Sequence, residues 1–215
     1  MIIDITHSIT PGLAVWPGDT RPTREVLLDM RRGDNLTLST LRATVHLGAH
    51  ADAPSHYSAD APSIDQCPLE CYLGLCQVVH VNVPRATRTT PEMLSAKIEA
   101  ERVLIATNTY PDPNSFNEDF AALSPELVDF LHAQGVRLVG IDTPSVDLFT
   151  SKDLPAHRRF LANDMAILEG LVLKHVPAGA YELIALPLKL AGFDASPVRA
   201  VLRELPPKAQ SGEPR

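Results

Sequence analysis

The sequence predicts a single α/β domain, and three observations support this expectation. Short runs rich in Val, Ile, Leu and Thr alternate with helical patterns along most of the 215 residues, as is typical of α/β proteins. A chain of this length corresponds to one domain of about 100–200 residues, with a core large enough to be stable without disulfides. Hydrophobic residues make up 45% and charged residues 21%, as in ordinary globular proteins. We expect the domain to cover residues 1–205 and the Pro-rich, polar residues 206–215 to form a disordered tail.

Local composition and capping signals predict the individual elements. Six segments have the composition of strands: Met1–Ile5, Leu36–Leu47, Cys76–Val83, Val103–Thr107, Val136–Ile141 and Tyr181–Leu186. One helix is expected to begin at Thr90, where a cap residue precedes proline, with Leu94 and Ile98 on one face. A second helix is expected to begin at Ser124 and to end at Gly135.

Charge and composition exclude several classes of protein. The 26 acidic and 19 basic residues give a net charge of −7, which argues against nucleic acid as a partner. No apolar run approaches the roughly 18 residues of a membrane span, and the first residues lack the pattern of a signal peptide. Three cysteines without a Cys-x-x-Cys pair indicate a reducing, cytoplasmic location. A small-molecule substrate is therefore the expected partner, with neither nucleic acid nor membrane.

The strongest chemical signal is a cluster of histidines around one glycine. His46, His50, Asp52 and His56 lie within eleven residues and are separated by even intervals, which places side chains on one face of a strand. Four residues of extended chain span about 13 Å, near the limit for two histidines that share one metal. We therefore expect the strand to bend or end at Gly48, because glycine allows a tight turn.

Imidazole and carboxylate in this pattern suit a metal such as zinc, iron or manganese. Small neighbouring residues leave room for an ion and a substrate, and the two oxygens of Asp52 could bridge two ions. Further ligands are sought elsewhere, and His157 and Glu169 are the best candidates. From the residues alone, a position on a helix surface is the favoured interpretation of His157, and an exposed strand end is as well supported as a ligand role for Glu169. Asp164 has the position of a turn residue.

Other residues carry weaker signals. Trp16, the single tryptophan, lies in a turn-forming segment and could pack in the core or form the wall of a ligand site. His7, His80, His132 and His175 have no ligand-type neighbours, and we interpret them as structural.

Residues 46–56 resemble the His-x-Gly-Thr-His-x-Asp-x-Pro-x-His signature of the metal-dependent cyclase-like hydrolases. More narrowly, the chain is similar to the bacterial kynurenine formamidases (arylformamidases) of that family, along most of its length. The chain differs from the wider family by having Ala49 in place of threonine, which fits the kynurenine formamidase branch. Leu148 stands where proline is expected after Asp147.

The resemblance implies a swivelling β/β/α fold, with a mostly antiparallel, barrel-like sheet flanked by helices, and a homodimer. It implies two zinc ions per subunit, with Mn²⁺ or another divalent ion as an alternative, one held by His46, His50 and Asp52 and the other by Asp52, His157 and Glu169. It also implies that His56 transfers protons and that Trp16 lies against the substrate.

The expected function is the zinc-dependent hydrolysis of N-formyl-L-kynurenine to L-kynurenine and formate, a step of tryptophan degradation. Within the same class, a related enzyme could act on a cyclic amide such as isatin. A mononuclear iron oxygenase is a different alternative, because His50, Asp52 and His157 also fit a two-histidine, one-carboxylate site. A metal- or ligand-binding protein without catalysis would leave His56 without a role.

Overall fold

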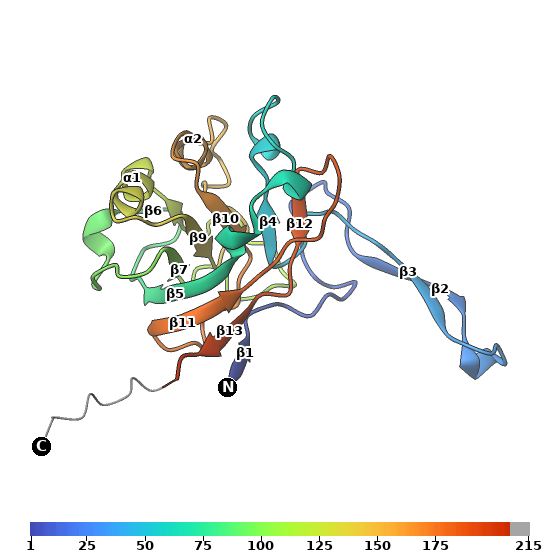
Figure 1. Cartoon of the computed structure of the whole chain (residues 1–215). Helices are drawn as coiled ribbons and strands as arrows, with labels where there is room; N and C mark the ends of the chain where they lie inside the picture. Colours follow the sequence, from blue (N-terminus) through green and yellow to red (C-terminus); the bar gives the residue numbers. More distant parts are fainter. Residues whose placement is uncertain (207–215) are drawn as a thin grey trace, which may run out of the picture.

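A curled sheet of nine strands organises the protein (Figure 1). The computed structural model describes residues 1–206, so the expected tail lies, apart from Pro206, outside the described residues. The strand order is β1-β13-β11-β5-β7-β9-β10-β4-β12. The strands are β1 Ile2–Asp4, β4 His50–Asp52, β5 Leu73–His80, β7 Arg102–Ala106, β9 Leu138–Ile141, β10 Ala166–Glu169, β11 Gly179–Ile184, β12 Ala195–Pro197 and β13 Val201–Glu204.

The sheet is mixed. The central strands β5, β7, β9 and β10 pair in parallel, and the five outer pairings are antiparallel. The result is a half-barrel with both α-helices on one face, which confirms the expected fold class. Among residues 1–206 no helix is both long and apolar enough to cross a membrane.

The strand period of two distributes apolar residues to both faces of the sheet. In β7, Val103 and Ile105 pack with the helices α1 (Pro125–Ala133) and α2 (Pro155–Ala162). Leu104 and Ala106 face the opposite core, which contains side chains of β5, β11 and β13. The central strands are therefore buried on both sides, as in parallel sheets generally.

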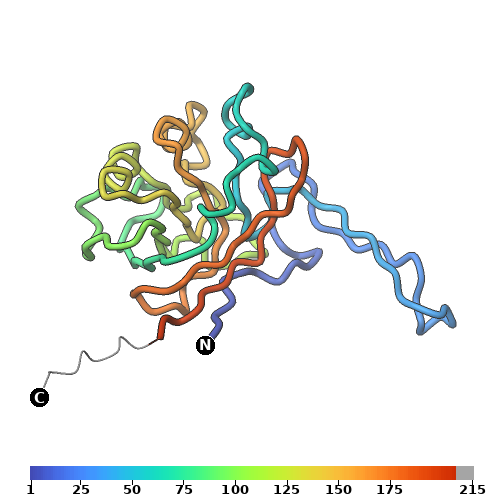
Figure 2. The backbone as a smooth tube through the Cα atoms, viewed as in Figure 1, coloured from blue at the N-terminus to red at the C-terminus, as the bar shows by residue number. Residues whose placement is uncertain are grey.

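Short elements complete the chain. Two small sheets are formed by β2 (Thr23–Leu28) with β3 (Leu38–Arg42) and by β6 (Arg88–Thr89) with β8 (Ala122–Leu123). The 3₁₀ helices are η1 Met30–Arg32, η2 Pro54–His56, η3 Ile64–Gln66, η4 Leu69–Tyr72 and η5 Pro91–Met93. Figure 2 shows that the β2–β3 hairpin projects from the body of the protein as an arm. The long strand expected over 36–47 is therefore shorter, because the chain leaves the arm after Arg42.

One expected helix is confirmed and the other is wrong. In α1 the Ser124 side chain accepts a hydrogen bond from the Leu127 backbone N–H, and Gly135 follows at φ +84°. The helix expected after Thr90 is a single 3₁₀ turn. The reason is tertiary, since the amide of Gln77 in β5 bonds the backbone of the next segment at two points, 97 and 99. These bonds hold a segment without regular secondary structure where local propensity favours a helix.

Candidate metal centre

Two paired strands bring ligand-type side chains together. β4 and β10 are antiparallel, and their register places His50 opposite Glu169. Asp52 lies two residues beyond His50, on the same face of β4. All three side chains are almost completely buried, with 2–3% of each residue exposed. A histidine and two carboxylates thus share one buried spot, where they need compensating charge.

Asp52 lies at the middle of the cluster. Its Oδ1 is 3.1 Å from Nδ1 of His46 and 3.4 Å from Nε2 of His50, and its Oδ2 is 3.4 Å from Nε2 of His157. Glu169 lies between the latter two histidines, with Oε2 3.3 Å from His50 Nε2 and Oε1 3.6 Å from His157 Nε2. The structure therefore brings together all five residues that the sequence and the resemblance proposed as ligands.

Each histidine is oriented by a bond to its outer ring nitrogen. Nδ1 of His50 lies 2.8 Å from the carbonyl oxygen of Gly48, which only accepts, so Nδ1 carries the proton. Nε2 of His46 lies 3.0 Å from the Asp194 carboxylate. The remaining nitrogen of each ring faces Asp52. Metal-binding histidines are usually held in this way, with the other ring nitrogen bonded to an oxygen.

His157 is held by the start of helix α2. Asp147 lies with Oδ2 2.9 Å from Nδ1 of His157, and it also accepts the backbone N–H groups of Ala156 and His157. Arg88 donates to the other oxygen of Asp147 at 2.7 Å. Burial alone would raise the pKa of Asp147, but its bonds to His157 and Arg88 lower it. One carboxylate therefore caps the helix and orients its histidine.

The inner atoms of the cluster lack ordinary partners. Within residues 1–206, His50 Nε2 and both carboxylate oxygens of Asp52 are buried without a hydrogen bond of acceptable geometry. Buried polar atoms are nearly always satisfied, whereas the two Asp52 oxygens lie 3.1–3.4 Å from ring nitrogens of His46, His50 and His157. The donor set and its unsatisfied atoms fit a divalent cation.

The electrostatics point the same way. Burial alone would lower the pKa of His50, but the carboxylates of Asp52 and Glu169 raise it to about 10. Burial also disfavours the charged form of His157, but Asp147 and Asp52 favour it and raise the pKa of His157 to about 10. The pKa of Asp52 is held well below its usual value by the histidines, against the effect of burial. The buried carboxylates therefore require positive charge, which protons or metal ions can supply.

Two glycines allow this close packing. Gly48 has φ +56°, which confirms the expected bend, and Gly170 has φ +66°. A Cβ on Gly170 would lie 2.1 Å from the carbonyl oxygen of Gly48, the same oxygen that orients His50. The loop before β4 and the end of β10 can approach each other only without a side chain at this position.

His56 lies beside the cluster and is more exposed. Its Nδ1 is 3.5 Å from Asp194, and its ring centre is 4.2 Å from that of His46. Ligand atoms of His46, Asp52 and His56 lie within 4.8 Å of one another, as do those of His50, Asp52 and Glu169. His56 is thus within ligating distance as well as beside the cavity, so the distances alone do not separate the two roles.

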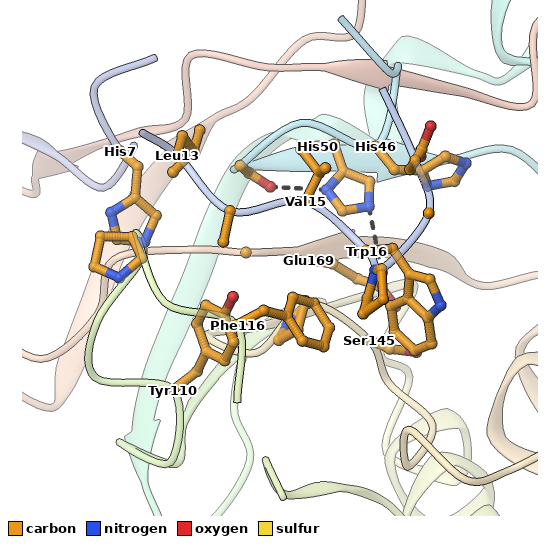
Figure 3. A pocket seen from close by; sticks show the side chains of 18 of the residues that line it. His7, Leu13, Val15, Trp16, His46, His50, Tyr110, Phe116, Ser145 and Glu169 are labelled. Carbon is orange, nitrogen blue, oxygen red and sulfur yellow. Dashed lines mark hydrogen bonds and ion pairs between the residues drawn. The ribbon is translucent and has the colours of Figure 1, made fainter. Parts of the chain in front are cut away.

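The cluster opens into a cavity of about 520 Å³, within the range of about 300–1,000 Å³ for small-molecule sites. Figure 3 shows the cavity with Trp16 and His46 toward one end and His7 and Tyr110 toward the other. The Trp16 ring packs on those of Phe116, Phe120 and Phe149 at centre distances of 5.0–6.2 Å. Trp16 therefore belongs to an aromatic wall of the cavity, one of the two positions that the sequence allowed.

Sequence reasoning missed several residues of the site. His7 was expected to be structural, and the structure places it in the lining of the cavity. Asp194 gave no signal, since it lies far along the chain from the histidines it contacts. Asp147 could have been found, because it falls in a segment that carries the family resemblance. Tyr110 lies in a proline-rich loop whose path local sequence does not determine.

Comparison with known proteins decides the family. The Cyclase family model, described as "Putative cyclase", matches residues 3–148, more than half of the chain. The chain belongs to the Cyclase family. The match includes the His46–His56 segment, while His157 and Glu169 lie beyond its end.

Solved structures extend the similarity over nearly the whole cyclase-family chain. A "potential metal-dependent hydrolase with cyclase activity" superposes with a TM-score of 0.83 at 27% identity, covering 96% of this chain and 99% of that one. A "predicted metal-dependent hydrolase" from Bacillus stearothermophilus gives 0.78 at 28% identity, covering 94% and 97%. Isatin hydrolase A from Labrenzia aggregata gives 0.80 at 25% identity, covering 94% and 93%.

Proposed function

We propose that this protein is a metal-dependent amide hydrolase that converts N-formyl-L-kynurenine and water to L-kynurenine and formate. One observation carries the proposal. Three oriented histidines and two carboxylates converge at one end of a cavity whose wall is aromatic. An aryl amide would place its ring against that wall and its scissile carbonyl beside the cluster. Membership of the Cyclase family and similarity to metal-dependent hydrolases support this function.

We propose that the cluster would hold two divalent ions, zinc or Mn²⁺, one through His46, His50 and Asp52 and one through Asp52, His157 and Glu169. Oδ1 of Asp52 faces His46 and His50, and its Oδ2 faces His157, so Asp52 would belong to both sets. Glu169 would complete the second set. When bound, the ions would lower the pKa of a coordinated water toward 7 and polarise the amide carbonyl.

The residues of the chain then have distinct tasks. His56 would accept a proton from water and return it to the departing aniline nitrogen, since an imidazole can both accept and donate a proton. Asp194, 3.5 Å from its Nδ1, holds the ring beside the cluster. Trp16 and Phe116 would hold the aromatic ring of the substrate and keep bulk water from the reacting bond. The expected cytoplasmic location remains part of this proposal.

A cyclic amide such as isatin is the second candidate substrate. The observation that favours it is the similarity to isatin hydrolase A across nearly the whole chain. Ring opening of an aryl lactam needs the same water activation and the same protonation of an aryl nitrogen. The cluster does not distinguish the two substrates, because the difference lies at the other end of the cavity.

Two measurements test the proposal. Metal analysis of the purified protein should find about two divalent ions per chain, and the loaded enzyme should hydrolyse N-formylkynurenine faster than isatin. A single iron per chain with oxygen uptake would establish the oxygenase alternative. Full metal occupancy without hydrolysis of any aryl amide would leave a binding protein.

A variant decides the role of His56. We expect His56→Ala to keep its metal content and to lose most turnover, because a proton carrier contributes roughly 10²–10⁴-fold. Loss of metal together with turnover would make His56 a ligand. His132→Ala, on α1 and outside the cavity, is the matched control and should change neither quantity.

We also propose a homodimer in which the β2–β3 arm contacts the second copy. An isolated two-stranded hairpin is marginal in water, and this one exposes Val26, Leu27, Leu38 and Leu41 at 38–62%. Residues 20–43 carry five arginines and three acids, a net charge of +2. The rest of the −7 chain is therefore at −9, so an acidic body of a second copy complements the basic arm.

Light scattering after size-exclusion chromatography tests the dimer. The wild-type chain should elute as a dimer, and Leu27→Asp with Leu41→Asp should give a folded monomer with an unchanged circular dichroism spectrum. A monomeric wild type, or a double variant that stays dimeric, would contradict the proposal.

A further inference from the structure

We propose that His7 and Tyr110 form a recognition site, at the end of the cavity away from Trp16, for a net-neutral polar tail such as a zwitterionic α-amino acid group. The inference rests on the proposed function and deepens it, because it names the part of the substrate that this end of the cavity binds. Figure 3 shows both side chains at this end, with His46 and Trp16 at the other.

His7 is carried on a rigid piece of backbone. Just before it, the Ile5 N–H and the Thr6 hydroxyl both donate to the carbonyl of residue 200 at 3.0 Å. The Ile5 carbonyl in turn accepts the N–H of residue 172 at 2.9 Å. The segment is therefore hydrogen-bonded on both sides, to the residue that directly precedes β13 and to the chain that follows β10. A side chain placed in this way can be selective, since little order is lost on binding.

Tyr110 is positioned by a buried carboxylate. Asp142, at the end of β9, accepts the backbone N–H groups of Thr107 and Asn108 at 2.7–3.0 Å. Thr109 then fixes the loop by accepting the N–H of residue 121 at 2.8 Å. The Tyr110 ring packs edge-on against Phe116 at 5.8 Å. The loop that carries the hydroxyl is thus organised before a ligand arrives.

The polar tips of both side chains are available to a ligand. Both side chains line the cavity and are half-buried rather than enclosed by the protein. Burial lowers the pKa of His7, and burial and Asp112 raise the pKa of Tyr110 to about 12. Both groups are therefore neutral at pH 7, and each offers one donor and at least one acceptor.

The charge of the cavity selects the kind of tail. Among its lining residues, all within the described part of the chain, there is no lysine and no arginine, and outside the proposed metal ligands the one acidic residue is Asp19. A lone carboxylate at this end would lose hydration without a cationic partner, which is costly. An α-amino acid group has no net charge, and its ammonium donates while its carboxylate accepts. Two neutral groups that both donate and accept match this pattern.

The middle of the cavity separates the tail from the reacting bond. Leu13, Val15 and Phe116 line it between the two polar ends. This arrangement fits an aryl ring with a hydrolysable amide on one side and a polar chain on the other. Isatin has a ring and an amide but no such chain, so it would leave His7 and Tyr110 without a partner.

Three formamides that share the scissile bond test the proposal. They are N-formylkynurenine, 2-formamidoacetophenone, which lacks the amino acid tail, and 4-(2-formamidophenyl)-4-oxobutanoate, which keeps the carboxylate but lacks the amine. The measured quantity is the preference for the tail, which is kcat/KM for N-formylkynurenine divided by kcat/KM for 2-formamidoacetophenone. We expect His7→Phe and Tyr110→Phe each to lower this preference by roughly tenfold through KM, as for the loss of one hydrogen bond to a charged group. Tyr181→Phe, whose hydroxyl bonds Pro177 outside the cavity, is the matched control.

The outcomes are distinct. An unchanged ratio in either variant, or equal losses on both substrates, would overturn the recognition site. Wild-type preference for the deaminated substrate over N-formylkynurenine would overturn the charge argument. If the metal-loaded wild type hydrolyses none of the three formamides, the proposed function fails. The recognition site is then tested by a binding measurement that does not depend on turnover. Trp16 is the single tryptophan, so its fluorescence reports binding of kynurenine and of 2-aminoacetophenone. A selective loss of kynurenine binding in His7→Phe supports the site, and no binding of kynurenine by the wild type refutes it.

Discussion

Replacing Gly170 with alanine tests whether close backbone packing holds the metal ligands in place. Gly170 follows Glu169 directly, and an added Cβ would lie 2.1 Å from the carbonyl oxygen and 2.7 Å from the carbonyl carbon of Gly48. Both atoms belong to the backbone, so neither can move as a flexible side chain would. The displaced carbonyl is the one that accepts from Nδ1 of His50 at 2.8 Å.

The magnitude has two parts. A non-glycine residue at a positive φ costs about 1–2 kcal/mol, and the overlap with Gly48 adds about 1–3 kcal/mol. The control is Gly135→Ala, where φ is +84° and nothing lies within 4 Å of the added Cβ. The control should therefore show only the first part, and the difference between the two variants measures the overlap. Tilting His50 should also lower metal affinity by roughly 10–100-fold in Gly170→Ala.

Urea unfolding of the metal-free proteins measures the first quantity, and competition with a chelator measures the second. We expect Gly170→Ala to be less stable than Gly135→Ala by about 1–3 kcal/mol and to be the only one of the pair with weakened metal binding. Equal stability of the two variants, together with wild-type metal affinity in Gly170→Ala, would refute the packing argument.

Three further predictions follow from the site and from its supporting helix. Asp147→Asn should weaken metal binding by roughly 10–100-fold, because the amide no longer fixes the tautomer and orientation of the His157 ring. Chelator competition measures the affinity, with Asp129→Asn as the control. Equal affinities in the two variants would contradict the prediction. Metal affinity should fall as pH falls from about 8 to 6. Although burial opposes it, the carboxylates raise the pKa values of His50 and His157 to about 10, so both rings carry protons in the metal-free site, and these protons must leave when a metal binds. Calorimetry in buffers of different ionisation enthalpy should detect the proton release, and a pH-independent affinity would contradict the prediction. Ser124→Ala should lower the free energy of unfolding by about 1 kcal/mol through loss of the α1 cap, and an unchanged urea midpoint would show that the cap contributes nothing.

Much of the site could be predicted because its signals are local. The even spacing of His46, His50 and Asp52 and the bend at Gly48 lie within a few residues. β4 places His50 and Asp52 on one face, as the spacing indicates, and His46 lies before the bend. Helix α1 was equally predictable, since its cap, stripe and terminal glycine are all contained in the segment it forms. Local chemistry of this kind depends on neighbouring residues and needs no knowledge of the fold.

The segment after Thr90 shows where local signals fail. Its cap, proline and apolar spacing favour a helix, but Gln77 on β5 forms hydrogen bonds to a non-helical backbone. A helix and an extended segment of this length differ by little in local free energy, because helix propensities are a few tenths of a kcal/mol per residue. Tertiary bonds can therefore reverse the preference, and the sequence contains no local sign of them.

The sequence by itself determined the chemistry of this protein: a cluster of imidazoles and carboxylates, on a strand interrupted by glycine, in a cyclase-family chain. Only the tertiary structure decided which distant groups orient that cluster and which line its cavity. Asp147 lies 10 residues from His157 in the sequence, and Asp194 lies 148 residues from His46. His7 and Tyr110, which are also distant in the sequence, line the same cavity. The physical reason is that ligand type and spacing are properties of a short segment. Orientation and substrate recognition depend on distances between segments, which are set only once the sheet has folded around its core.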